Sequence, residues 1–184
     1  MKKAFIYFTL IVGIAAIIGA CKKDENDAAT TSETLTCTGT SSGSGPTIGS
    51  VALEEATYLS ACDAYTDSSG NNVSRKIQLV FKNSTEAQYT SYSYSDSSCS
   101  TTPTNTWNGC MTPITISSTV VAKSLGNGSG NALGFNATAG WKHNTDPQYI
   151  QFSADNASVF RYNQSSNEAD RASNSIWYFT FTKQ

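Results

Sequence analysis

Residues able to perform catalysis are few in this 184-residue chain. The run Gly39-Thr40-Ser41-Ser42-Gly43 matches the G-x-S-x-G pattern of hydrolase nucleophiles, but that pattern needs a strand before the serine and a helix after it. It lies instead in a Ser- and Gly-rich segment, where a chance match is expected. The one histidine, His143, has Asp146 nearby to orient it, yet no nucleophile is assignable to the pair. The sequence therefore predicts that the protein is not an enzyme.

Metal binding has little support in the sequence. A zinc site needs closely spaced Cys pairs or several His, whereas the chain has 5 Cys without such spacing and one His. Asp63, Asp67 and Asp96 fall in expected turns, but the spaced ligands and terminal Glu of a calcium-binding loop are missing. We expect no metal and no cofactor.

Aromatic residues, 11% of the chain, are the better candidates for binding. Trp107 lies in an expected polar loop, 102–109, where its flat face suits a sugar ring or a protein partner. The alternative is that Trp107 folds over a barrel end as a plug. Tyr92 and Tyr94 share one face of an expected strand and Tyr89 lies on the other. If the Tyr92 face points outward it forms an aromatic ladder for ligands; otherwise the pair belongs to the core.

The chain begins with features of an export signal. Lys2 and Lys3 precede an apolar run, 4–18, that is too short for a comfortable membrane span and is followed by small residues. The tetrapeptide Ile18-Gly19-Ala20-Cys21 resembles the lipobox of bacterial lipoproteins. That resemblance implies cleavage after residue 20 and acylation of Cys21, which attaches a protein to a membrane without crossing it. The alternatives are an ordinary cleaved signal peptide or an uncleaved anchor helix.

Residues 21–50 have the composition of a flexible tether. A charged cluster, 22–27, is followed by Ser, Thr, Gly and Ala with hardly any large apolar side chains, too few to offset the entropy of ordering. The cluster resembles export tethers of surface-displayed lipoproteins of Gram-negative bacteria, and Lys22 is not the aspartate of an inner-membrane retention signal. The resemblance implies an outer-membrane location, at the cell surface or on the periplasmic face. The alternative is that the cluster is a solvated spacer.

The charge of the chain argues against nucleic-acid binding. The formal net charge is −2, and it becomes −4 once Lys2 and Lys3 are removed with the signal. A mildly acidic domain lacks the basic surface that nucleic acid requires. We therefore expect partners at the envelope, namely the membrane through its lipid anchor and a glycan or a host or matrix protein.

Four cysteines remain if Cys21 is acylated, an even number suited to an oxidising compartment. Cys62 and Cys99 fall near the ends of the first and third expected strands, which run in the same direction and so reach the same rim. Cys110 is placed at the start of the strand returning from that rim. This favours a Cys62–Cys99 pair, leaving Cys37 with Cys110. The alternative pairs Cys99 with Cys110 across a local loop.

Residues 51–184 are expected to form one all-β domain. Alternation is clear at Ile77, Leu79 and Phe81, which is the two-residue period of a sheet with one buried face. The same period recurs in 176–182. The expected strands, about eight in number, are 56–64, 74–82, 87–95, 114–123, 132–141, 149–154, 158–163 and 176–182. They favour a small up-and-down antiparallel barrel, with a β-sandwich as the alternative.

The segments around Cys62 and Cys99 carry a family resemblance. Tyr58-Leu59-Ser60-Ala61-Cys62, followed by Tyr94-Ser95-Asp96-Ser97-Ser98-Cys99, resembles a pattern of uncharacterised exported lipoproteins with a small lipocalin-like barrel. Those proteins usually carry Gly-Thr-Trp where this chain has Ala56-Thr57-Tyr58. The resemblance implies a barrel over residues 56–183 and no established activity. A binding or adhesion module is the function we expect, with a structural envelope lipoprotein or a lipocalin-type carrier of a small apolar molecule as alternatives.

Overall fold

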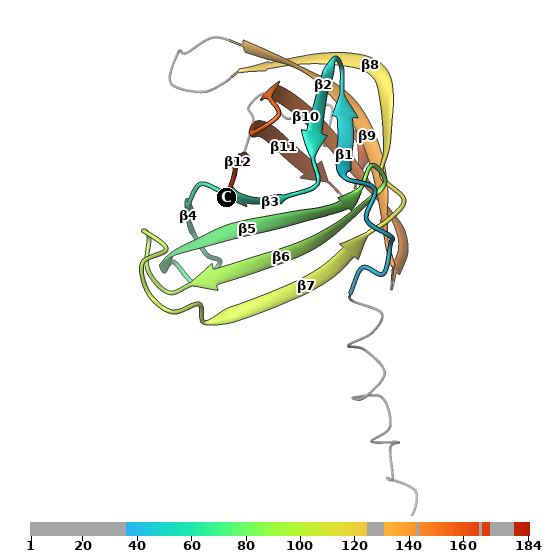
Figure 1. Ribbon diagram of the computed structural model, residues 1–184. Coiled ribbons are helices and arrows are strands. Elements are labelled where there is room, and N and C mark those ends of the chain that lie inside the picture. Colours follow the sequence, from blue (N-terminus) through green and yellow to red (C-terminus); the bar gives the residue numbers. More distant parts are fainter. Residues whose placement is uncertain (1–35, 125–130, 143, 166, 170–178) are drawn as a thin grey trace, which may run out of the picture. The chain divides into compact units, whose positions relative to one another are not determined.

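The computed structural model describes residues 36–124, 131–142, 144–165, 167–169 and 179–184. These residues form strands joined by turns (Figure 1). No helix among them is long and apolar enough to cross a lipid bilayer. In chain order the strands are β1 (Ser44–Ile48), β2 (Val51–Glu54), β3 (Thr57–Ser60), β4 (Asp63–Thr66), β5 (Asn72–Asn83), β6 (Glu86–Tyr94), β7 (Asn105–Met111), β8 (Thr115–Ser124), β9 (Asn131–Trp141), β10 (Asn144–Asn156), β11 (Val159–Ser165) and β12 (Phe179–Lys183).

Eight of these strands close into an antiparallel barrel. Their order is β10-β11-β12-β3-β5-β6-β7-β9, and β9 also pairs with β10, which completes the ring. In addition, β4 pairs with β5 and β8 pairs with β9. The prediction of a small up-and-down barrel is confirmed. The sandwich alternative is excluded, because a continuous ring of strands is not a pair of separate facing sheets.

The barrel interior follows the predicted alternation. Ile77, Leu79 and Phe81 of β5 are each at most 2% exposed. They face Ser91, Tyr89 and Ala87 across the β5–β6 ladder. In β12 the same pattern buries Phe179 and Phe181, while the preceding residues of the predicted strand lie outside the described residues.

One half of the barrel interior is packed with aromatic rings. Phe160 stacks on Phe181 with a 4.9 Å separation of ring centroids and meets Tyr58 edge-on at 5.1 Å. Phe81 and Phe152 complete the group. The Tyr58 hydroxyl, although its side chain is fully buried, donates a 2.7 Å hydrogen bond to the Ala157 carbonyl. We call this half, where β5 ends, the closed end, and the half where β5 begins the open end.

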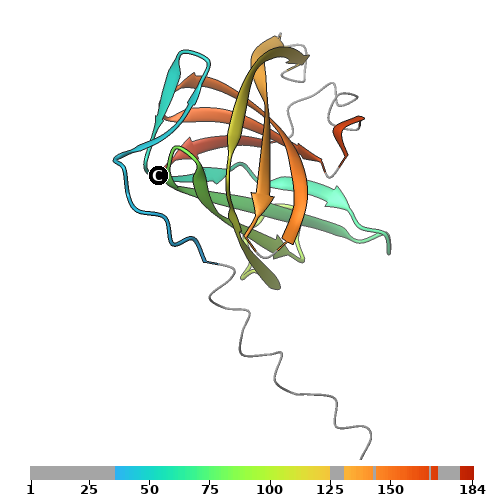
Figure 2. The ribbon, with the colours of Figure 1, turned by 90° about the vertical axis from the view of Figure 1, so that its right-hand side faces the viewer.

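The hairpin of β1 and β2 packs against the closed end, beside β5 and β10 (Figures 1 and 2). Ile48 and Leu53, 2% and 1% exposed, belong to the same apolar core as the barrel residues. Gly49, with φ of 63°, provides the first position of the two-residue loop, where a positive φ favours glycine.

The folded domain therefore starts before residue 51, and the later part of the predicted tether is structured. The polar composition of 21–50 concealed a local hairpin signal, in which Gly49 and Ser50 separate two short apolar segments. The Cys37–Cys110 disulfide holds the chain to the barrel even earlier.

The prediction of a loop at 102–109 was also wrong in part, because residues 105–111 form β7. Its residues pair with β6 from Ser93↔Asn105 to Ala87↔Met111. Asn105, Asn108 and Gly109 suggested a loop, but pairing with a long neighbouring strand overrides such weak local preferences. Cys110 consequently lies near the end of a strand, not at its start as expected.

Candidate functional site

A cavity of about 420 Å³ occupies the open end of the barrel. Small-molecule sites typically measure roughly 300–1,000 Å³. The described lining residues are Arg75, Ile77, Tyr89, Gln148, Tyr162, Gln164, Ser165 and Phe179. Apart from Ser165, they occupy inward positions of strands that surround the barrel axis, so the cavity belongs to the interior of the barrel.

The cavity exists because inward side chains change from aromatic to polar towards the open end. The inward residues in that direction are Phe81, Leu79, Ile77 and Arg75 in β5, Phe152, Ile150 and Gln148 in β10, and Phe160, Tyr162 and Gln164 in β11. Long polar side chains do not fill a barrel centre as aromatic rings do, because burying their polar groups is unfavourable unless those groups are hydrogen-bonded. This gradient was not predicted from the sequence, because it can be recognised only when the inward positions of three separate strands are known.

Arg75 is the charged side chain among the described residues that line the cavity. Its Nε donates a 2.9 Å hydrogen bond to Oδ2 of Asp63 on β4. Its guanidinium carbon lies 4.8 Å from the ring centroid of Phe179 and 5.5 Å from that of Tyr65. Such cation–π contacts restrain the guanidinium. With 42% of the side chain exposed, a cation is held at the entrance of a cavity whose walls are partly apolar and partly polar.

A short hydrogen-bond chain lines the opposite wall. The Tyr162 hydroxyl donates to Oε1 of Gln164, and Nε2 of Gln164 donates to Oε1 of Gln148 at 2.7 Å. Burial raises the pKa of Tyr162 well above its usual value and that of Tyr89 to about 12. Both phenols therefore stay neutral at physiological pH and remain hydrogen-bond donors.

Trp107 lies in β7 and belongs to an aromatic cluster, not to an exposed loop as predicted. Its ring meets Tyr89 at 5.6 Å and Trp141 at 5.0 Å, both edge-on. Gly109 makes room for this contact, because a Cβ there would lie 2.5 Å from the Trp107 ring and 2.9 Å from that of Trp141. Trp107 nevertheless keeps 40% of its surface exposed.

Tyr92 and Tyr94 lie on the outer face of β6, opposite the inward Tyr89. The Tyr92 hydroxyl donates a 3.2 Å hydrogen bond to Oε1 of Gln78 on the neighbouring strand. Tyr94 is only 9% exposed. The pair therefore belongs neither to the barrel core nor to the cavity, and Tyr94 offers little surface to a ligand.

The cysteines pair as the sequence analysis favoured. Cys37 bonds to Cys110 and Cys62 to Cys99, with Cα–Cα distances of 5.0 and 5.9 Å, within the usual range for disulfides. The Cys62–Cys99 bridge follows β3 and β6 at the open end. The Cys37–Cys110 bridge ties the segment before β1 to the far end of β7.

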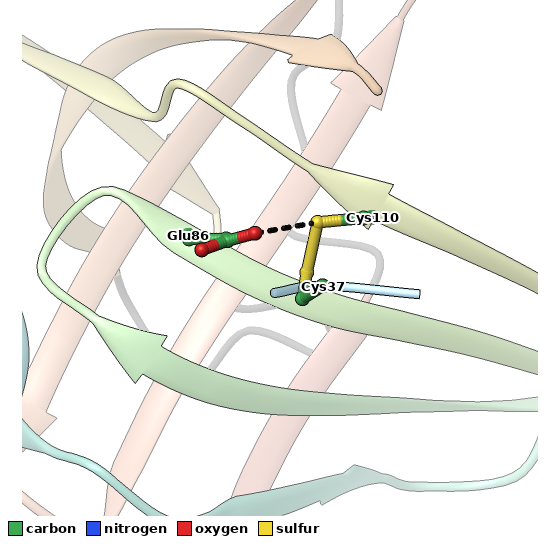
Figure 3. A group of neighbouring side chains, drawn as sticks. All are labelled: Cys37, Glu86 and Cys110. Atoms are coloured by element: carbon green, nitrogen blue, oxygen red, sulfur yellow. Dashed lines mark hydrogen bonds between the residues drawn. A yellow bond between two sulfur atoms is a disulfide. The ribbon is translucent and has the colours of Figure 1, made fainter. Parts of the chain in front are cut away.

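Buried Glu86 lies beside the Cys37–Cys110 bridge, with a carboxylate oxygen 3.1 Å from Cys110 Sγ (Figure 3). The same oxygen accepts a 3.2 Å hydrogen bond from the Thr38 amide. The side chains of Cys37, Glu86 and Cys110 bring together sulfur and carboxylate oxygen atoms, which are atom types that bind metals. Because both sulfurs are joined in the disulfide, neither is a thiolate, the form that coordinates metals.

The remaining sequence candidates have local roles where the structure describes them. Ser41 of the hydrolase-like motif donates a 2.8 Å hydrogen bond to Glu55, and none of the described residues before it, 36–40, lies in a strand. Asp67 and Asp96 accept hydrogen bonds from their own turns, for example from Asn71 and Thr101. His143 lies outside the described residues.

A second hollow, of about 280 Å³, lies along β8 and β9. Its lining is mainly hydroxyl and amide side chains, namely Thr115, Ser117, Thr119, Asn136 and Thr138, with Ala137 and Glu168. It offers less apolar surface than the barrel cavity, which is therefore the better candidate site.

The fold and cavity define a class: a small closed β-barrel with a disulfide at each end and a binding-sized cavity at one of them. No protein-family model, curated protein or solved structure matches the chain. Function must therefore be argued from the cavity itself.

Proposed function

We propose that the domain is a lipocalin-type binding protein that holds a small, partly apolar molecule in the cavity at the open end of its barrel. The observation that carries this proposal is the cavity of about 420 Å³, whose apolar and aromatic lining residues are Ile77, Tyr89, Tyr162 and Phe179. Burying apolar ligand surface against such walls contributes roughly 25 cal/mol per Å². The few polar groups would orient the ligand.

The rigidity of the barrel supports this role. Strands closed into a ring and two disulfides preorganise the cavity, so that little ordering entropy is lost when a ligand enters. The Cys62–Cys99 bridge lies at the end that would admit the ligand.

The proposal extends to a membrane anchor. Acylation of Cys21 would hold the barrel at the outer membrane, at the cell surface or on the periplasmic face, close to ligands that leave or enter the envelope. Cys21→Ser should abolish lipid attachment and leave an unprocessed precursor, which mass spectrometry of the N-terminal peptide measures. An unmodified mature N-terminus in the wild type would disprove the anchor without affecting the binding proposal.

Fluorescence titration with the neutral probe N-phenyl-1-naphthylamine tests the binding proposal. The probe should bind the wild type with enhanced emission. Ile77→Trp, which fills the cavity, should weaken binding at least about tenfold because the ligand volume is lost. Lys76→Trp provides the matched control, since Lys76 is the adjacent position on the outer face of β5.

Equal binding by both variants would place the probe outside the cavity and contradict the proposal. Absence of binding to the wild type would contradict it as well, and would favour a structural envelope lipoprotein. Both variants are first compared with the wild type by melting temperature, so that misfolding is recognised.

Adhesion to a glycan or matrix protein is a second candidate, carried by the 40% exposure of Trp107 and 44% of Tyr65. Tyr65→Ser should reduce attachment to a glycan and matrix-protein panel if adhesion is the function. Unchanged attachment, or none by the wild type, would contradict it.

A further inference from the structure

We infer that the ligand of the barrel cavity is a small carboxylate with an aromatic or short aliphatic body, whose carboxylate binds the guanidinium of Arg75. This inference rests on the proposed binding function and specifies its ligand class. Three features of the cavity support it: the charge at the entrance, the hydrogen-bonding groups of the wall and the space available.

The charge of the cavity entrance is set by Arg75. Asp63 accepts a hydrogen bond from Nε only, and no described residue accepts one from the Nη groups. A guanidinium binds a carboxylate through two parallel N–H groups, so an Nη pair remains available for a second carboxylate. No Asp or Glu is among the described lining residues, which disfavours a cationic ligand.

The guanidinium of Arg75 is held in position before any ligand binds. The Phe179 and Tyr65 rings contact its guanidinium, and Asp63 holds it from the β4 side. An arginine restrained in this way loses less entropy on binding an anion than one that is free in solvent.

The other polar groups also present donors. The side-chain oxygens of Gln148 and Gln164 already accept hydrogen bonds within the wall. Among the described contacts, Nε2 of Gln148 has no acceptor and remains able to donate. A carboxylate is an acceptor-only group, which such donors match.

The size of the ligand is limited by the aromatic packing of the closed end. Phe81, Phe152 and Phe160 fill the interior beyond the cavity, and all three are at most 1% exposed. A long acyl chain therefore has no channel to follow through the described core. The rings of Tyr89, Tyr162 and Phe179 suit a short or aromatic body.

Competition against bound N-phenyl-1-naphthylamine tests the inference with 4-phenylbutyrate and 4-phenylbutyramide, which share a body but differ in charge. The acid should displace the probe at a concentration at least about tenfold lower than the amide, because a hydrogen bond to a charged group is the stronger. Arg75→Gln should remove this preference while the probe itself still binds.

Lys76→Gln is the control that removes a neighbouring cation from the outer face of β5 and leaves Arg75 in place. It should retain the preference for the acid, because Lys76 does not line the cavity. Equal displacement by acid and amide in the wild type, or loss of the preference in Lys76→Gln, would overturn the inference. Failure of the probe to bind the wild type would instead overturn the proposed function on which it rests.

Discussion

At the scale of single residues, the Trp107 side chain on β7 connects two neighbouring strands of the barrel. It contacts Tyr89 on β6 and Trp141 on β9. β7 and β9 share one residue pair in their ladder, Met111 with Trp141. The edge-on ring contacts add to this sparse pairing. Edge-on aromatic pairs contribute about 0.5–1.5 kcal/mol each beyond the area they bury.

Trp107→Ala should therefore lower the free energy of unfolding by about 2 kcal/mol, through lost ring contacts and the space left beside Gly109. Urea denaturation measures the change. Thr106→Ala, the exposed outward neighbour, should alter stability by no more than about 0.5 kcal/mol. An unchanged midpoint for Trp107→Ala would show that the ring contacts do not stabilise the barrel.

At the scale of elements, the β1–β2 hairpin acts as a lid on the closed end. Its apolar residues Ile48 and Leu53 share the core with Tyr58, and the Glu54 amide donates a 3.1 Å hydrogen bond to the Tyr58 hydroxyl. The hairpin thereby keeps water from the aromatic half of the barrel. It leaves the cavity end free.

Ile48→Ala should destabilise the domain by about 3 kcal/mol, the usual cost of truncating a fully buried aliphatic side chain. The adjacent exposed Thr47 provides the control, and Thr47→Ala should change stability by less than about 0.5 kcal/mol. Thermal unfolding followed by circular dichroism compares the two. Equal melting temperatures would mean that the hairpin is not part of the cooperative unit.

At the scale of the whole molecule, the two disulfides tie opposite ends of the barrel. Each should stabilise the fold by about 2–4 kcal/mol through the loop it closes. The Cys37–Cys110 bridge spans 73 residues and the Cys62–Cys99 bridge 37. Each doubling of loop length adds only about 0.6 kcal/mol to the entropic cost of closing the loop, so the two disulfides differ little in the stabilisation expected from loop closure.

Replacing Cys37 and Cys110 together by Ser should consequently cost about 0.6 kcal/mol more than the same change at Cys62 and Cys99. Only the second replacement lies near the cavity and should also weaken probe binding. Non-reducing peptide mapping checks the pairing itself, and a recovered Cys99–Cys110 peptide would contradict it. Denaturation of the two double variants measures the stability difference.

The fold class and the favoured cysteine pairing could be predicted from the sequence alone. Alternation at Ile77, Leu79 and Phe81 reports which side chains share a face, because that period is a property of the extended backbone alone. Cys62 and Cys99 reach one rim because strands two apart in an up-and-down sheet run in the same direction. These inferences need only local geometry and chain direction.

Three features could not be predicted from the sequence: the start of the domain, the position of Trp107 in a strand, and the cavity lined by Arg75, Gln148 and Gln164. Each depends on partners distant in sequence: β6 for β7, the barrel core for Ile48, and strands almost 90 positions apart for the cavity. Alternation assigns residues to a face but not to a level along the barrel axis. That level is set by register, which emerges only when the ring of strands closes.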